Sequence, residues 1–373
     1  MKTSIAQQAG WAKYCWALLV WLISGLSVRA QNSWGAEHVA KLQGMMGVYE
    51  GDLNGKYPIR LVLRPGNTDS SVVGTYYYLS KGKPLELRGH IQPSLSTPSI
   101  ELRELAPADT VPTGWFSISL SYYPEVLGHW YNKSGTTLLP LRMKRINGAA
   151  QPLVASAQVK SKTYLKYYTV PVVTVPNAAL MAMLDQYFSF ESLMSQSLSS
   201  FLEEVRQKQK DGDHTGLESI AYTENYNANG LLSITVRRDV IGANAWHNYE
   251  SRTIDLNTGF PIILTDEIQP QKLQSFLALG ERKLHQEVLK YLSVPQNALN
   301  PVDKQGLLEQ HFMLSSTDEY AVFGNEIQCH HSVNYDALSN MISKLFTDEF
   351  MVHFTTAELK SFLKPESPLQ RLP

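Results

Sequence analysis

The sequence predicts an all-β N-terminal sandwich or barrel module followed by an α+β domain with an antiparallel sheet. Residues 44–146 carry short alternating runs separated by turn signals at intervals of about ten residues, as all-β sandwiches and barrels do. Residues 160–346 follow the order strand, long helix, strands, helix and strands, which is typical of an α+β domain. Between these modules, Asn147–Pro152 is small and proline-ended and predicts a linker.

The first thirty residues predict a cleaved signal peptide. Lys2 and Lys13 precede the short apolar run Trp16–Ile23, and small residues lead to a cleavage site after Ala30. The apolar run is too short to span a bilayer comfortably, although an uncleaved anchor is the alternative. No later apolar segment approaches membrane length, so we expect an exported protein of the periplasm, outer surface or medium without an integral membrane span.

Composition narrows the classes of function. The 373 residues are 43% hydrophobic, which is ordinary for a globular protein. Loss of residues 1–30 removes three of the 33 basic residues and no acidic one, leaving 30 against 34 and a net charge of −4. This balance argues against nucleic acid as a partner. Only Cys329 then remains, so no intramolecular disulfide can form, which suits a bacterial envelope protein.

The N-terminal module is expected to contain eight short strands. Its many aromatic residues are favoured strand formers that usually fill cores, although exposed aromatic clusters also stack on sugars. The expected strands are Val48–Leu53, Tyr57–Leu63, Val72–Leu79, Leu85–Ile91, Ser99–Leu105, Trp115–Leu120, Val126–Tyr131 and Leu138–Met143.

The second module is organised around the stretch Asn229–Glu267. Asn229-Gly230 is a strong hairpin signal, because both residues tolerate positive φ. In the strand that follows, Leu231, Ser233, Thr235 and Arg237 are expected on one face and Leu232, Ile234, Val236 and Arg238 on the other. Asn177 is expected to cap a helical region of residues 178–210, and residues 347–373 to form a C-terminal helix and tail.

Several ordered motifs in residues 160–346 carry a family resemblance. They include Val170-Pro171 before the long helix, Gly230-Leu231-Leu232-Ser233-Ile234, Ile254-Asp255-Leu256-Asn257-Thr258-Gly259 and Ile263-Leu264-Thr265-Asp266. This region resembles the exported domains of unknown function in the ectodomain of the anti-sigma factor RsiV and in the accessory part of a peptidoglycan deacetylase. The resemblance implies an interaction domain that engages cell-wall glycan or a lysozyme-like protein. Where that family has a Gly-Gly-Ala-His-Pro-like turn, this chain departs from it between Ile241 and His247.

Two segments are candidate binding regions. We interpret Gly242–Asn248 as a long turn on the sheet, where Trp246, His247 and Asn248 would contact a ligand, or where Trp246 would instead cover the core. The second candidate is the expected strand Glu326–Val333 with His330 and His331.

Candidate chemistry is sparse. Cys329, His330 and His331 are adjacent on a strand, so at most two of them can share one site, and a buried cysteine beside surface histidines is the simpler interpretation. Asp255, Asp266 and Glu267 are possible acid partners, but acids at turns are common. Motifs for a serine nucleophile, a helical zinc site or a phosphate loop do not occur. The sequence therefore predicts a non-catalytic binding protein without a metal or cofactor; a glycan-directed hydrolase or deacetylase is the alternative.

Overall fold

The computed structural model describes residues 44–68, 70–92, 99–106, 111–213, 215–242, 245–297, 299–314, 320–331, 338–339 and 350–373. The predicted signal peptide, residues 1–30, lies outside these ranges. Among the helices in these ranges, none is both long and apolar enough to cross a membrane.

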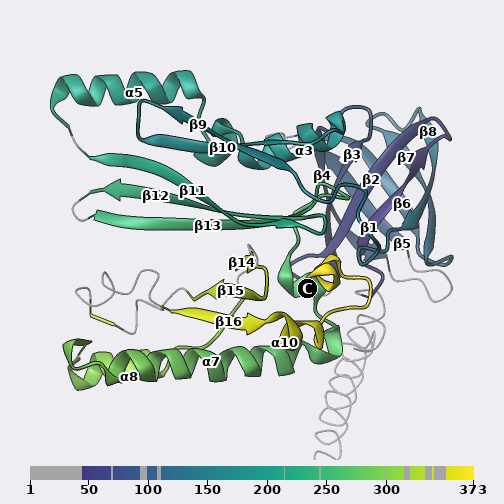
Figure 1. The fold of residues 1–373 in the computed structure, drawn as a ribbon. Coiled ribbons are helices and arrows are strands. Elements are labelled where there is room, and N and C mark those ends of the chain that lie inside the picture. Colours follow the sequence, from purple (N-terminus) through teal and green to yellow (C-terminus); the bar gives the residue numbers. More distant parts are fainter. Residues whose placement is uncertain are drawn as a thin grey trace, which may run out of the picture.

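The N-terminal module is a closed antiparallel barrel of eight strands, which decides between the sandwich and the barrel (Figure 1). Strand β1 pairs with both β2 and β8, so the sheet has no free edge. Tyr49, Ile59, Tyr76 and Phe116 are fully buried in its interior, and Tyr122 is exposed. The strands are β1 Gly47–Leu53, β2 Tyr57–Pro65, β3 Ser71–Tyr78, β4 Pro84–Gln92, β5 Ser99–Leu105, β6 Pro112–Ser119, β7 Glu125–Asn132 and β8 Leu138–Arg145.

The second module contains a five-stranded sheet in the order β13-β12-β11-β10-β9. Its bounds are β9 Gln158–Tyr164, β10 Tyr168–Thr174, β11 Gly216–Ala228, β12 Leu231–Ile241 and β13 Ala245–Asp255. The sheet is mixed, not wholly antiparallel as expected, because β10 pairs with β11 in parallel. A parallel pair needs a crossover, and helices α3 Ala178–Phe188, α4 Phe190–Met194 and α5 Leu198–Asp211 supply it. Asn177 caps α3 as predicted.

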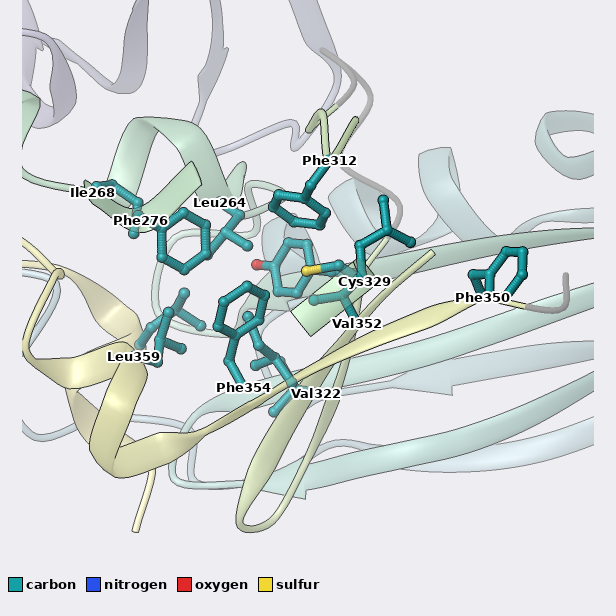
Figure 2. Packing of buried hydrophobic residues seen from close by; sticks show 14 of the residues in the cluster. Leu264, Ile268, Phe276, Phe312, Val322, Cys329, Phe350, Val352, Phe354 and Leu359 are labelled. Atoms are coloured by element: carbon teal, nitrogen blue, oxygen red, sulfur yellow. The ribbon is translucent and has the colours of Figure 1, made fainter. Parts of the chain in front are cut away.

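A smaller sheet in the order β14-β15-β16 lies on the face of the large sheet opposite to helices α3 and α5 (Figure 1). Helix α7 covers the outer face of this small sheet. Leu231 of the large sheet belongs to the core that the small sheet and α7 share. Val322 and Cys329 of the small sheet and Phe276 of α7 meet in the same core (Figure 2). The elements are α6 Leu264–Glu267, α7 Leu273–Ser293, α8 Pro301–Leu308, β14 Tyr320–Phe323, β15 Glu326–His330, β16 Met351–Thr355, α10 Thr356–Lys360 and the short helix η4 Pro368–Arg371. Residues 350–373 thus contribute a strand as well as the expected helix.

The barrel packs directly against the second module. Val62 and Tyr77 of the barrel form a buried cluster with Met183 of α3 and Phe260. The Tyr77 hydroxyl donates to the carbonyl of Thr258 at 2.7 Å. Apolar contact and a buried hydrogen bond therefore join the two modules at the end of β13 that lies nearest the barrel.

Candidate functional site

The face of β11–β13 that is turned toward the small sheet is polar. Alternation along β12 and β13 places hydroxyl side chains on this face, and Ser233 and Thr253 are buried. The hydroxyl of Thr253 donates to Ser233 Oγ at 3.1 Å, and the amide of Val322 in β14 donates to the same oxygen at 3.0 Å. At the next register position, Thr235 and Ser251 share a hydrogen bond of 2.8 Å. The small sheet is therefore joined to this row of hydroxyl groups by the Val322 amide, beside the apolar contact that it makes with Leu231.

Further along the same face, four side chains form a hydrogen-bonded cluster. Asp239 of β12 is its centre: one carboxylate oxygen lies 2.5 Å from His247 Nδ1 and accepts from Arg237 Nε at 2.7 Å, and the other accepts from Ser219 Oγ at 2.6 Å. The strand register produces this arrangement, because Asp239 is directly opposite both Ser219 in β11 and His247 in β13. We call these four residues the Asp239 cluster.

The Asp239 cluster is partly open to solvent and carries charge. The side chains of Arg237 and His247 are 43% and 45% exposed, whereas that of Asp239 is 21% exposed. Desolvation alone would raise the pKa of Asp239, but the hydrogen bonds from Ser219, Arg237 and His247 outweigh it and hold the pKa below its ordinary value. Asp239 is thus a carboxylate at neutral pH and fixes the orientation of both neighbouring donors.

An aromatic pair joins the Asp239 cluster to the small sheet. The rings of Tyr249 in β13 and His330 in β15 are stacked, with centroids 6.0 Å apart and planes at 24°. The guanidinium carbon of Arg237 lies 5.9 Å from the Tyr249 ring centroid. Burial lowers the pKa of His330, so its ring is neutral at neutral pH. His247 and His330 therefore lie in one neighbourhood, although they are far apart in sequence.

The other predicted residues do not join this neighbourhood. Asn248 is on the opposite face of β13, where it accepts from Arg238 Nη1 at 3.3 Å. His331 is 6% exposed and lies in the core, so the expectation of a surface histidine is wrong, whereas Cys329 is buried as expected. Trp246 lies in β13 opposite Val240, and the position of its side chain is outside the described part.

The long turn expected between Gly242 and Asn248 is wrong. Strand β13 begins at Ala245, which pairs with Ile241 at the end of β12. The expected contact residues are therefore strand residues, and alternation sends adjacent ones to opposite faces of the sheet. Sequence analysis missed Ser219, Asp239 and Tyr249, but extending the polar alternation of Ser233, Thr235 and Arg237 by two positions identifies Asp239.

The Asp239 cluster lacks the contact that activates a serine nucleophile. Ser219 Oγ donates to the carboxylate of Asp239, whereas a catalytic serine donates to the histidine base. Within the described ranges, no three His, Cys, Asp or Glu side chains are grouped closely enough to hold a metal ion. The arrangement offers fixed hydrogen-bond donors and acceptors on a rigid sheet.

The three candidate acids lie elsewhere, around a cavity of about 330 Å³ between the barrel and the second module. Asp255 is buried and accepts from Arg371 Nη2 at 2.6 Å, while Asp266 pairs with Arg64 Nε of the barrel at 3.1 Å. Burial raises the pKa of Asp266, and it raises that of Glu267 to about 7. The structure thus gathers all three acids at one cavity, but it separates them from the predicted histidines.

Comparison with known proteins gives few matches. No protein-family model and no curated protein matches this chain. Among solved structures, it is similar to a DUF3298 family protein from Pseudomonas aeruginosa PAO1, with 13% identity and a TM-score of 0.36 over 59% of this chain and 97% of that one. It is also similar to a DUF3298 family member from Bacteroides fragilis NCTC 9343, with 9% identity and a TM-score of 0.35 over 60% of this chain and 98% of that one.

Proposed function

We propose that this chain is an exported, non-catalytic recognition protein of the bacterial cell envelope, and that the Asp239 cluster is the centre of its binding surface. The observation that carries the proposal is the fixed orientation of His247. Its Nδ1 is engaged by Asp239, whereas its Nε2 makes no hydrogen bond within the described residues. Groups held in place by strands and by second hydrogen bonds lose little conformational freedom on binding.

Cell-wall glycan is the ligand that this surface suits first. A glycan presents many hydroxyl and amide groups, which can accept from the exposed Arg237 guanidinium and donate to Nε2 of a neutral His247 ring whose Nδ1–H donates to Asp239. A lysozyme-like protein is the second candidate, and it is favoured by the sequence resemblance of residues 160–346 to envelope interaction domains.

The enzymatic alternative, a glycan-directed hydrolase or deacetylase, would use the acids at the inter-module cavity. A pKa of about 7 suits Glu267 to act as a general acid. A hydrolase of this class also needs a second carboxylate that acts as base or nucleophile. Asp266, the adjacent candidate, is engaged by Arg64, and Asp255 is engaged by Arg371. This pairing favours binding over hydrolysis.

Co-sedimentation with purified peptidoglycan and pull-down with lysozyme test the proposal. We expect His247→Ala to weaken binding by about fivefold to tenfold, the loss of roughly one hydrogen bond, with little change in thermal stability because the ring is half exposed. The matched control is His129→Ala, which removes an exposed histidine from the barrel. Trp246→Ala distinguishes a tryptophan that contacts the ligand from one that covers the core. If Trp246 contacts the ligand, the variant should lose binding while its thermal stability is unchanged.

Three outcomes would contradict the proposal. Equal binding by the His247→Ala and His129→Ala variants would show that the Asp239 cluster is not part of the binding surface. Release of soluble fragments or acetate from peptidoglycan by the purified protein would favour the enzymatic alternative. An intact N-terminus, instead of one beginning at Gln31, on protein recovered from the envelope would contradict cleavage of residues 1–30.

A further inference from the structure

The inter-module cavity is built from three parts of the chain. Barrel residues Val48 and Val62 form one wall, Phe260 and Ile268 of the second module form another, and the C-terminal segment around Lys364 closes a third side. Figure 1 shows the C-terminus lying against the junction of the two modules. A volume of about 330 Å³ is at the lower end of the range for small-molecule sites, and a ligand there would touch all three parts.

Most charged groups around the cavity are already paired. Besides the pairs of Asp255 and Asp266, Glu366 is paired with Arg145 of the barrel at 2.7 Å. Lys364 forms no ion pair among the described residues, and neither does Glu267, whose carboxyl group has no described cation, Lys364 included, within ion-pair distance. Its side-chain partner is the buried hydroxyl of Ser367.

The surroundings of Glu267 make it the group that would gain most from a cationic ligand. Burial is the largest influence on its pKa and raises it, and the charge of Asp266 raises it further. The Ser367 hydroxyl, Lys364 and Arg64 lower the pKa without cancelling the effect. Arg145, Glu366 and Asp255 also line the cavity but are held in their own pairs. An ammonium group in contact with Glu267 would supply the missing counter-charge.

We propose that this cavity is a binding site for a small primary amine, with the ammonium group on the Glu267 carboxylate and an apolar body against Val48, Val62, Phe260 and Ile268. The proposal is independent of ligand recognition at the Asp239 cluster. Because the site exists only where barrel, second module and C-terminal segment meet, the bound amine stabilises their association.

The charge on the probe is the first test. We would measure binding of 2-phenylethylamine, 2-phenylethanol and 3-phenylpropionate to the full chain by ligand-observed NMR and calorimetry. These probes share a ring and differ in the polar end. The amine is expected to bind at millimolar concentration or better, and the alcohol and the carboxylate much more weakly. Equal binding of all three, no binding of the amine, or preferred binding of the carboxylate, which would indicate Lys364 as the anchor, would each overturn the proposal.

The second test replaces Glu267 itself. Glu267→Gln keeps the shape of the side chain and removes its charge, and it is expected to weaken amine binding by at least about 30-fold. The control is Glu203→Gln on the exposed face of α5, which is expected to leave the affinity unchanged. Wild-type affinity for the amine is also expected to rise about tenfold between about pH 6 and about pH 8, because the carboxyl group must lose its proton to pair with the ammonium. Unchanged affinity in Glu267→Gln, with native circular dichroism, would refute the site.

Discussion

Arg371→Met should destabilise the second module although the residue lies only two positions from the end of the chain. Arg371 and Asp255 are each about 5% exposed, and Nη2 lies 2.6 Å from the carboxylate. Removal of one partner from a buried pair costs about 3–5 kcal/mol, because the other charge stays buried. Methionine replaces much of the aliphatic stem, so the loss arises mainly from the uncompensated carboxylate.

Two features of the structure reduce the loss of stability expected for Arg371→Met. Asp255 keeps hydrogen bonds from the amide of Asn257 and the hydroxyl of Thr258. The substitution also removes Arg371 Nη1, a buried nitrogen with no hydrogen-bond partner among the described residues, whose desolvation costs about 1 kcal/mol or more. We therefore expect a loss of about 2–3 kcal/mol. The double variant Asp255→Asn with Arg371→Met should lose less than Arg371→Met alone, because no buried charge remains.

Urea unfolding followed by circular dichroism measures the loss, and hydrogen exchange at the Asp255 amide, which is bonded to the Phe260 carbonyl, reports it locally. A loss under about 0.5 kcal/mol in Arg371→Met would show that the buried ion pair contributes little to stability. A double variant less stable than the single one would refute the charge argument even if the single variant behaves as expected.

Three further predictions concern single sites. Gly280→Ala in α7 should destabilise by about 1 kcal/mol or more despite the better helix propensity of alanine, because the new Cβ would lie 2.1 Å from Cδ1 of the buried Phe312 ring; urea unfolding measures this, and a gain in stability would contradict it. Because the pKa of Glu267 is raised in the folded state, the stabilisation that its proton provides at low pH should be lost as pH rises from about 4.5 to about 7. Glu267→Gln should flatten the curve of folding stability against pH in this range. An unchanged slope in that variant would show that Glu267 is not the titrating group. Asp239 has a lowered pKa, so its contribution to folding stability is present above the ordinary carboxyl pKa of about 4 and is lost as pH falls below it. Asp239→Asn should remove this loss of stability at acid pH and should also weaken ligand binding at His247. The effects of Asp239→Asn and His247→Ala on binding should not be additive.

Local signals in the sequence predicted local structure well. Asn229 and Gly230 both have positive φ, 52° and 72°, as the hairpin signal required. The alternation of Ser233 and Thr235 with Leu232 and Ile234 identified the polar face before its partner was known. Closure of the barrel was not predictable in the same way, because it depends on β1 pairing with β8 across more than eighty residues of chain.

The candidate site also depends on pairing between distant strands, which local sequence signals do not reveal. Gly242–Asn248 has the composition of a turn, yet β13 begins at Ala245, because pairing with β12 supplies partners for backbone groups that local composition cannot reveal. Tyr249 and His330 meet only because the small sheet packs on the hydroxyl row, and nothing in either strand specifies that contact.

The hydroxyl row explains why part of this face of the large sheet stays exposed. An apolar face on β12 and β13 would have sealed against the small sheet along its whole length. Instead, buried Ser233 satisfies the amide of Val322 at one end, and the polar alternation continues to Asp239, whose partners are strand neighbours and not the small sheet. Buried polar groups demand partners at specific positions, so they fix where the small sheet sits and thereby leave the Asp239 cluster partly exposed. Replacing Ser233 by alanine would test this coupling: it would leave the Val322 amide unpaired at a cost of about 1–3 kcal/mol, and altered exposure of His247 would show that the two ends of the row act together.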